Sequence, residues 1–388
     1  MKLLAISVQV ILLLVFLFHY SKKCRQSYEA LTFIELHKQL VARETFEKDT
    51  ELKRLLDDFK EKKPEEWIGE IKVAGRAIAP AVMMLNRHAL NITLNWLCNV
   101  AGFAGVHDRL IIFAFDSPTV ASLRKHWPRL HVLDWPIEPL QNRFSTGDGA
   151  YQLFQLFRAN LAAFLAEKSL EFWMIQSDTY WRANLFDRAD PALHMNYTDE
   201  LLFDREGSSG LLADMIAGGN FFVKGTKKTT AFFERVSETL LWLYSTDNNL
   251  MGALCAHKFA DLNCAFIPYS TLSNWRWHYG DKKQLPSLLQ FDGGTGSEGK
   301  LEKMRSLGAA FVAFEKDGKA RCDKRKSADP ARAIDRDRLN AQGNDSNMIQ
   351  MSLSFFHNAC ELLYAAMPAV GLFIRGTLFP FYAYFIMF

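Results

Sequence analysis

The chain has 388 residues, of which 49% are hydrophobic, and this is enough to bury the core of one large domain or of two small ones. Its 46 basic and 43 acidic side chains leave a formal charge of only +3, so the composition gives no reason to expect nucleic acid or an acidic protein as a partner. The six cysteines contain no CxxC pair, which argues against a structural zinc site.

The N-terminus has the composition of a membrane segment. Within residues 3–18 only Ser7 and Gln9 are polar, and the apolar stretch from Leu3 to Tyr20 just reaches the roughly 17 to 20 residues that cross a bilayer. A cleaved signal peptide is the alternative, but no small-x-small cleavage site follows. We predict a signal anchor over residues 1–20, which sends the rest of the chain into the secretory lumen. The basic residues after the span mildly oppose that orientation.

Residues 21–69 are polar and rich in Lys and Glu, with Leu and Phe at roughly helical spacing. Pro64 marks the expected end of the helical part, because proline interrupts a helix. We predict a helical stem between the membrane and the folded domain, either solvated or self-associating.

Residues 70–316 alternate short apolar runs with amphipathic stretches. The strands expected here cover residues 77–86, 109–116, 130–135 and 170–178, and the helices cover residues 89–103, 117–127 and 149–168. For the second helix, Ser117 is the expected N-cap and Pro118 the first residue. The alternation predicts an α/β fold with a doubly wound, mostly parallel sheet flanked by helices. Ligands of such sheets bind beyond the carboxyl ends of the strands, where Asp116 and Asp178 both fall.

The C-terminal part differs from this domain. Residues 317–347 are charged and lack apolar periodicity, so we predict a disordered linker. Residues 348–388 end in an almost wholly apolar stretch with Arg375 in its middle. This stretch could be a second membrane span, a segment packed on the domain, or a tail without a folded role, and a central Arg would cost a span about 2.5–3.5 kcal/mol.

In an oxidising lumen some of the cysteines could pair. Cys255 and Cys264 are the nearest candidates, Cys24 beside the apolar segment could link two chains, and Cys98 is equally compatible with a buried free thiol. Three N-x-S/T sequons, at Asn91, Asn196 and Asn344, gain meaning only if the chain is lumenal.

Four clusters of acidic or amide side chains could carry chemistry. They are Gln176-Ser177-Asp178 at the end of the fourth strand, Asp214 ahead of Gly218-Gly219, Asp247-Asn248 at a helix start, and the glycine-rich segment 290–304 with Lys300. Backbone N–H groups and a lysine in such a glycine-rich loop could hold a phosphate.

Each cluster also has a structural interpretation. Asp247 is a good N-cap, Asp214 could be a solvated residue at a strand end, and the loop at 292–299 could be a surface turn. Asp178 is harder to explain in this way, because it ends a strongly apolar strand.

The order and spacing of these segments resembles the nucleotide-diphospho-sugar transferase domain, the GT-A type of glycosyltransferase found in plant arabinosyl- and xylosyltransferases and in many nematode proteins. The resemblance covers about residues 75–315 and rests on the segments "LNITLNWLCNV", "RLIIFAFD", "GAYQLFQLFRANLAAFLAEK", "FWMIQSDTYWRANLFD", "IAGGNFFVKGT", "STDNNLMGALC" and "FDGGTGSEGKLEKM". It implies a GT-A-like fold and a single-pass type II membrane topology in the Golgi, and on that ground we prefer the lumenal orientation.

In that family the fourth strand ends in Asp-x-Asp, and the second Asp lies three residues before a Trp. Here Asp178 precedes Trp181 by three residues, and Gln176 takes the place of the first Asp. The resemblance implies a divalent ion, Mn²⁺ or Mg²⁺, held by Asp178 and Gln176 with the donor diphosphate. A neutral amide should weaken its binding.

The resemblance assigns further roles. It implies donor binding by Tyr151, Arg158, Asp116, Lys300 and Gly293, and catalytic positions facing sugar and acceptor at Asp214, Asn220 and Asp247. A late metal ligand could be His278 or Asp292.

The sequence therefore predicts a metal-assisted glycosyltransferase of the secretory pathway, which moves a sugar from a nucleotide-sugar donor to a hydroxyl of a glycan or glycoprotein, with retention as the family implies. A non-catalytic relative that binds a nucleotide sugar or glycan is the alternative suggested by Gln176. A membrane scaffold or transport component that uses both apolar chain ends is a third.

Overall fold

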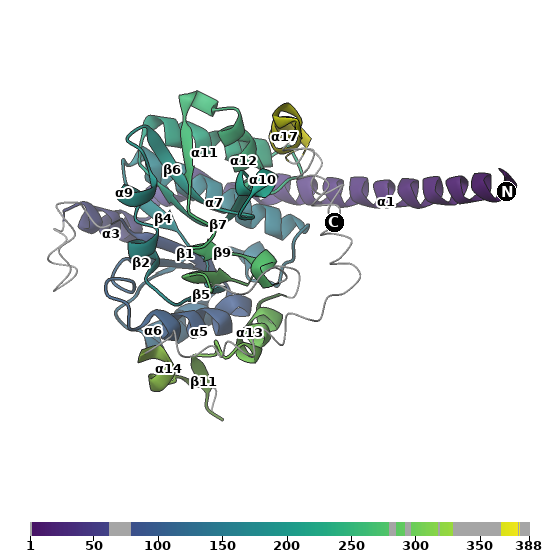
Figure 1. Ribbon diagram of the computed structural model, residues 1–388. Coiled ribbons are helices and arrows are strands. Elements are labelled where there is room, and N and C mark those ends of the chain that lie inside the picture. Colours follow the sequence, from purple (N-terminus) through teal and green to yellow (C-terminus); the bar gives the residue numbers. More distant parts are fainter. Residues whose placement is uncertain are drawn as a thin grey trace.

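The structure of the chain is a computed structural model that describes residues 2–61, 79–278, 285–291, 296–316, 319–328, 366–378 and 380. A seven-stranded sheet in the order β3-β2-β1-β4-β7-β6-β8 forms its centre (Figure 1). Its strands are β1 (Ala81–Leu85), β2 (Leu110–Ala114), β3 (His131–Asp134), β4 (Phe172–Met174), β6 (Asp199–Arg205), β7 (Ile216–Val223) and β8 (Asn263–Phe266).

The first half of this sheet is parallel, as the βα alternation predicts. Strands β3, β2, β1 and β4 run in the same direction, whereas β7 is antiparallel to both β4 and β6, and β6 and β8 are again parallel. The carboxyl ends of β1, β2 and β4 therefore meet at one edge of the sheet. A second, three-stranded sheet of β5 (Thr179–Trp181), β10 (Leu288–Gln290) and β9 (Leu272–Ser273) lies beyond that edge.

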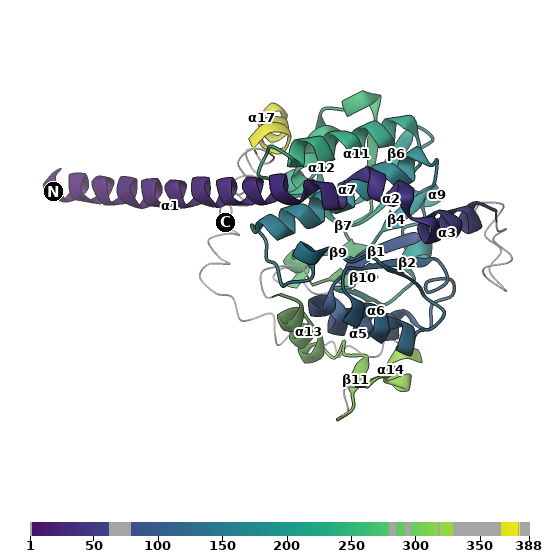
Figure 2. The same ribbon diagram turned by 180° about the vertical axis from the view of Figure 1, so that it is seen from behind.

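Helices cover both faces of the large sheet (Figures 1 and 2). The longer ones are α5 (Leu90–Val100), α6 (Ser117–His126), α7 (Gly149–Glu167), α11 (Lys227–Leu240), α12 (Asp247–Ala256) and α13 (Gly296–Ser306). The shorter ones are η2 (Arg87–Ala89), η3 (Glu138–Leu140), α8 (Leu185–Arg188), α9 (Pro191–His194), α10 (Gly210–Ala213), η4 (Phe259–Asp261) and η5 (Trp275–His278).

The pleat of the strands divides the core into two layers. Along β2, Ile111 and Phe113 pack with the buried side of α7, while Leu110 and Ile112 pack with α5 and α6. Because successive side chains of a strand point to opposite faces, a wholly apolar strand needs an apolar helix on each side. The uninterrupted hydrophobic runs that mark these strands in the sequence are the consequence.

The N-terminal helices form part of the domain. Helix α1 (Lys2–His37) projects from the body at its N-terminal end, and its C-terminal end packs along α7 (Figure 2). It is followed by η1 (Lys38–Val41), α2 (Arg43–Lys48) and α3 (Thr50–Glu61). Seven side chains from these elements are buried in the core that includes α7: Ile34, Val41, Phe46, Leu52, Leu55, Leu56 and Phe59.

The described part of the expected stem, residues 21–61, is thus largely helical, and its buried side chains belong to the core of the domain. Its apolar side chains cover the outer face of α7, which would otherwise be exposed. As for the expected anchor, no helix in the described part of the chain is long and apolar enough to cross a membrane.

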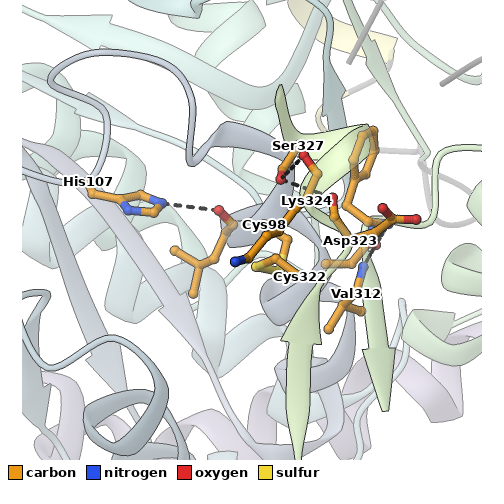
Figure 3. Close-up of a disulfide and its surroundings, with 10 residues drawn as sticks. Cys98, His107, Val312, Cys322, Asp323, Lys324 and Ser327 are labelled. Atoms are coloured by element: carbon orange, nitrogen blue, oxygen red, sulfur yellow. Dashed lines mark hydrogen bonds between the residues drawn. A yellow bond between two sulfur atoms is a disulfide. The ribbon is translucent and has the colours of Figure 1, made fainter. Parts of the chain in front are cut away.

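Two disulfides stabilise the domain, and one of them joins residues 224 positions apart. Cys98 on α5 is bonded to Cys322 on β12 (Ala320–Cys322), which forms a hairpin with β11 (Val312–Phe314) (Figure 3). Cys255 is bonded to Cys264, the pairing expected from the sequence. The first bond corrects the interpretation of Cys98 as a free thiol. Cys24 is exposed and free.

The expected linker and C-terminal tail are partly structured. Strand β12 and helix α14 (Lys324–Ala328) occupy the start of the region expected to be disordered, and the hairpin and the disulfide explain why they are ordered. Near the C-terminus, α17 (Pro368–Phe373) and the π-helix η7 (Ile374–Leu378) pack beside α12 (Figure 1). Of the three interpretations of this apolar stretch, a segment packed on the domain describes these residues.

Phe46 tests whether the N-terminal helices belong to the core. Its ring is fully buried and contacts the rings of Phe113, Trp135, Phe157 and Phe164. We expect Phe46→Ala to lower the free energy of unfolding by about 3–5 kcal/mol in urea titrations, because it leaves a cavity between α2, α7 and β2. Phe314→Ala, the same change at a 40% exposed ring, should cost less than about 1 kcal/mol. Equal, small effects would place the N-terminal segment outside the cooperative core.

Candidate functional site

The site lies where β4 leaves the large sheet. Ile175 is still bonded to β1 through its N–H, which donates to the carbonyl of Val82, and the chain then crosses into β5. Gln176, Ser177 and Asp178 form this crossing and are partly exposed. Because β5 pairs with β10 in antiparallel fashion, the crossing lies opposite Gln290 and Phe291, whose peptide N–H donates to the carbonyl of Asp178 over 2.7 Å.

Asp178 is paired with a lysine from α13. Lys300 Nζ donates to Asp178 Oδ2 over 2.7 Å, and both side chains are mostly buried. The other carboxylate oxygen, Oδ1, is also buried and has no hydrogen-bond partner among the described residues. The structure thus brings together two residues that the sequence places 122 positions apart.

Gln176 belongs to a chain of side-chain amides. Its Oε1 accepts a hydrogen bond from Gln290 Nε2 over 2.9 Å, and its peptide N–H donates to Asn220 Oδ1 over 3.3 Å. Asn220 Nδ2 in turn lies 3.4 Å from Gln290 Oε1. Asn220 and Gln290 are buried, so the side chain of Asn220 is held against Gln176, and its catalytic position stays a prediction.

A buried carboxylate missed by the sequence analysis holds this part of β7. Asp204 on β6 accepts the peptide N–H groups of Gly218, Gly219 and Asn220 over 2.7, 3.0 and 2.7 Å. The register between β6 and β7 shifts at this point. Gly218 has a φ of +76°, a conformation that glycine adopts without strain.

Burial determines the protonation of Asp204. It raises the pKa of this carboxyl to about 6, although the three peptide N–H groups and the charge of Arg158 act in the opposite direction. In the sequence, only the Gly218-Gly219 pair indicates this contact. It predicts that another group approaches the backbone closely, but it does not indicate that this group is Asp204.

Arg158 and Asp247 form a buried ion pair. Arg158 Nε donates to Asp247 Oδ2 over 2.7 Å, and its Nη1 donates to the carbonyl of Gly218 over 2.8 Å. Both side chains are less than a tenth exposed. Arg158 is therefore bound to Asp247 and to the backbone of β7, and its donor-binding role stays a prediction. Thr246, not Asp247, caps α12.

Tyr151 lies about two turns of α7 before Arg158. Burial raises the pKa of its hydroxyl, and the negative charge of Asp247 adds to this shift, whereas Arg158, Lys300 and a hydrogen bond with Gln155 oppose it. The hydroxyl is therefore neutral at physiological pH, and it lies in the field of both ion pairs of the site. Tyr151 remains a donor-binding prediction.

Two other predicted residues have different partners. Asp116 is the N-cap of α6, where Oδ1 accepts the peptide N–H of Thr119 over 2.9 Å and Oδ2 accepts that of Arg87 over 2.6 Å. This corrects the expected N-cap, Ser117, and leaves Asp116 buried in a structural role. Asp214 lies 3.3 Å from Arg375 of η7, and its side chain is 34% exposed.

Three predicted positions are not characterised by the structure. Gly293 and Asp292 lie outside the described residues, and nothing is described of the His278 side chain beyond its place in η5.

Of the four residues expected to hold Mn²⁺ or Mg²⁺, the two whose side chains the structure describes, Gln176 and Asp178, do not fit either ion. Gln176 Oε1 already accepts from Gln290, and Asp178 Oδ2 already accepts from the Lys300 ammonium group. No group of three or more His, Cys, Asp or Glu side chains that could hold a metal occurs in the described part of the chain. Divalent ions of this kind prefer several oxygen ligands with negative charge, and here one of two such positions is neutral and the other is paired with a cation.

Asp204 generates a prediction about pH. An unfolded Asp titrates near pH 4 and the folded one near pH 6, so in this window the folded state holds more protons than the unfolded state. The Asp204 contribution to stability is therefore fully present below about pH 4 and is lost, by roughly 3 kcal/mol, as the pH rises through 6.

Urea unfolding between these pH values should show this as a decline in the stability difference between the wild type and Asp204→Asn as the pH rises. Asp134→Asn, which removes an exposed carboxylate, is the control. A stability difference between wild type and Asp204→Asn that is flat across the window would contradict the prediction.

Residues 105–304 match the family model described as nucleotide-diphospho-sugar transferase. No curated protein matches the chain.

Similar solved structures include the apo form of WbbM, a bifunctional glycosyltransferase (11% identity, TM-score 0.39, 60% of this chain and 50% of that chain). A glycosyltransferase involved in glycosylation of the major capsid of PBCV-1 is 12% identical (TM-score 0.36, 59% of this chain and 99% of that chain). Apo mouse xyloside xylosyltransferase 1 is 9% identical (TM-score 0.38, 55% of this chain and 97% of that chain).

The matched segment covers just over half of the sequence and contains β4, the crossing with Asp178, and Lys300. The mostly parallel sheet with helices on both faces also fits the GT-A fold expected from the sequence. The chain belongs to the nucleotide-diphospho-sugar transferase family.

Proposed function

We propose that this protein is a glycosyltransferase that moves a sugar from a nucleotide diphosphate donor to a hydroxyl of a glycan or glycoprotein. The bond between the anomeric carbon and the diphosphate oxygen breaks, the acceptor oxygen bonds to that carbon, and the hydroxyl proton is released with the nucleoside diphosphate. Retention of configuration is proposed from the family alone. The observation that carries the proposal is the Lys300–Asp178 pair at the carboxyl edge of the sheet, inside the family segment.

The position of Lys300 suits a leaving diphosphate. It lies in the first turns of the 11-residue helix α13, whose N-terminal end carries a partial positive charge. An ammonium group and a helix N-terminus together stabilise the negative charge that develops on the nucleoside diphosphate as it leaves. Asp178 keeps the flexible lysine side chain at this place.

The sugar and acceptor side is proposed to include Asp214. Among the three predicted catalytic positions, Asn220 and Asp247 are buried and occupied by partners within the fold, whereas Asp214 is 34% exposed. Its neighbour Arg375 comes from the C-terminal segment, so that segment borders the proposed acceptor side.

We also propose that the domain works in the lumen of the secretory pathway, as a Golgi protein of type II topology attached through its N-terminal segment. The disulfides Cys98–Cys322 and Cys255–Cys264 support an oxidising compartment, because thiols are kept reduced in the cytosol.

A second candidate function follows from Gln176. A relative that binds a nucleotide sugar or glycan without turning it over would keep the fold and tolerate a neutral residue in the metal motif. The amide chain around Gln176 is the observation that favours this candidate.

Donor hydrolysis tests the enzyme. We expect the purified protein to hydrolyse at least one UDP- or GDP-sugar, and Lys300→Met to lower the rate roughly 10²–10³-fold, because the leaving diphosphate loses its cation. Lys125→Met removes an exposed lysine of α6 and should leave the rate unchanged. Binding without turnover would favour the second candidate, and no binding of any nucleotide sugar would contradict both.

Glycosylation tests the compartment. Asn196 and Thr198 of one sequon are exposed in the turn before β6, and the neighbouring Tyr197 is 95% exposed. In the sequon of Asn91, Thr93 is buried in α5 and its hydroxyl donates to the carbonyl of Ala89.

In cultured animal cells we expect peptide N-glycosidase to shift the full chain on a gel, and Asn196→Gln to remove one glycan from that shift. Asn91→Gln is the matched control and should change nothing. An unglycosylated wild-type chain would contradict the lumenal assignment.

A further inference from the structure

We propose that Gln176 presents hydrogen-bond donors to the site, so that the nucleoside diphosphate is held by Gln176 and Lys300 directly and without a divalent cation. The inference rests on the proposed function. It concerns how the donor is bound, and it assigns positioning roles to Gln290 and Asn220.

The direction of the amide chain is fixed by a main-chain group. The oxygen and nitrogen of an amide side chain resemble each other in shape, so their assignment depends on their partners. The peptide N–H of Gln176 can only donate, and Asn220 lies against it; the atom of Asn220 that faces it must therefore be Oδ1. A reversed Asn220 would place two donors against each other.

The next two steps follow from the first. With Oδ1 toward the peptide N–H, Asn220 turns Nδ2 toward Gln290, whose Oε1 accepts over 3.4 Å. Gln290 then turns Nε2 toward Gln176, whose Oε1 accepts over 2.9 Å. The carbonyl oxygen of Gln176 is thus directed into the fold, and its NH₂ group, which has no hydrogen-bond partner among the described residues, is the end that a ligand can meet.

Burial keeps this arrangement in place. Gln290 is 4% exposed and Asn220 is fully buried. A Cβ atom added at Gly219 would lie 2.3 Å from Gln290 Nε2, so the amide packs directly on the backbone of β7. Any other residue at position 219 would push Gln290 out of the chain of amides.

At both polar positions of the motif, 176 and 178, the structure therefore places groups that bind anions. Gln176 offers N–H groups, and beside Asp178 lies the Lys300 ammonium group. Donors and a positive charge bind phosphate oxygens well, and they repel a divalent ion.

Calorimetric titration of UDP and GDP into the full-length protein tests the inference without relying on turnover. We expect the same Kd in EDTA and in excess Mn²⁺, no heat from Mn²⁺ alone, and a roughly tenfold weaker Kd for Lys300→Met. Binding that appears only with Mn²⁺ would overturn the inference and leave the proposed function standing. No binding of either nucleotide with or without Mn²⁺ would overturn the proposed function as well.

Two variants address the direction of the amides. Gln290→Glu offers only acceptors to Gln176, so Gln176 must reverse and point its oxygen at the ligand. We expect nucleotide binding to weaken in EDTA and to recover with Mn²⁺. Gln176→Asp should gain heat from Mn²⁺ alone, because it restores a second carboxylate two residues from Asp178.

Gln39→Glu, at an exposed position of η1, controls for an added negative charge. Thermal midpoints check that each variant is folded. If folded Gln290→Glu and Gln176→Asp both bind UDP or GDP like the wild type, with no response to Mn²⁺, the assigned direction of the amide chain is wrong.

Discussion

Three peptide N–H groups of β7 converge on the carboxylate of Asp204, and the geometry of the site depends on this contact. From Gly218 the connection runs through its carbonyl to Arg158 and Asp247. From Asn220 it runs through the side chain to Gln176 and Gln290. The three hydrogen bonds to one buried carboxylate hold the backbone of residues 218–220 in place. The two hydrogen-bond networks that start from these residues therefore have fixed directions.

The ends of the chain add a second level of support. Gln26 of α1 donates to the carbonyl of Gly147, and the hydroxyl of Tyr244 donates to the same oxygen. This fixes the turn that begins α7, the helix of Tyr151 and Arg158. At the other end, Arg375 reaches Asp214 and the carbonyl of Gly376 lies 3.2 Å from His257 Nε2 of α12. Segments that look like appendages in the sequence therefore border the site from both sides.

Much of the scaffold could be predicted from local patterns. The strands at residues 109–116 and 130–135 and the helix at 149–168 appear within a residue or two of their expected bounds, because periodicity and apolar runs are local signals. The packing of the N-terminal helices against the domain could not be predicted. Polar residues dominate their composition, and the apolar side chains that contact α7 are too widely spaced in the sequence to indicate a buried face.

The site could be predicted in its members but not in its contacts. Asp178, Gln176 and Lys300 follow from motif and order, and the structure brings them to one edge. Asp204 and Gln290 carry no signal in the sequence, since an acid inside a strand and a glutamine in a short apolar run gain meaning only from the residues opposite them. Arg158 and Asp116 show the opposite case. Both are charged residues near a predicted motif, and their polar atoms are bound to partners inside the fold.

Charge balance connects the substitution at position 176 with the lysine at position 300. Two carboxylates in a motif of this kind carry two negative charges, which a divalent ion neutralises. With Gln176 the motif carries one, and the single positive charge of Lys300 at 2.7 Å from Asp178 balances it. A dication added to this arrangement would leave an excess of positive charge in a largely buried site. Burying unpaired charge is unfavourable, and only the binding of a diphosphate would offset it. The same excess is useful if it is supplied by the lysine alone, because the diphosphate then brings the negative charge and finds an ammonium group and amide donors already in place.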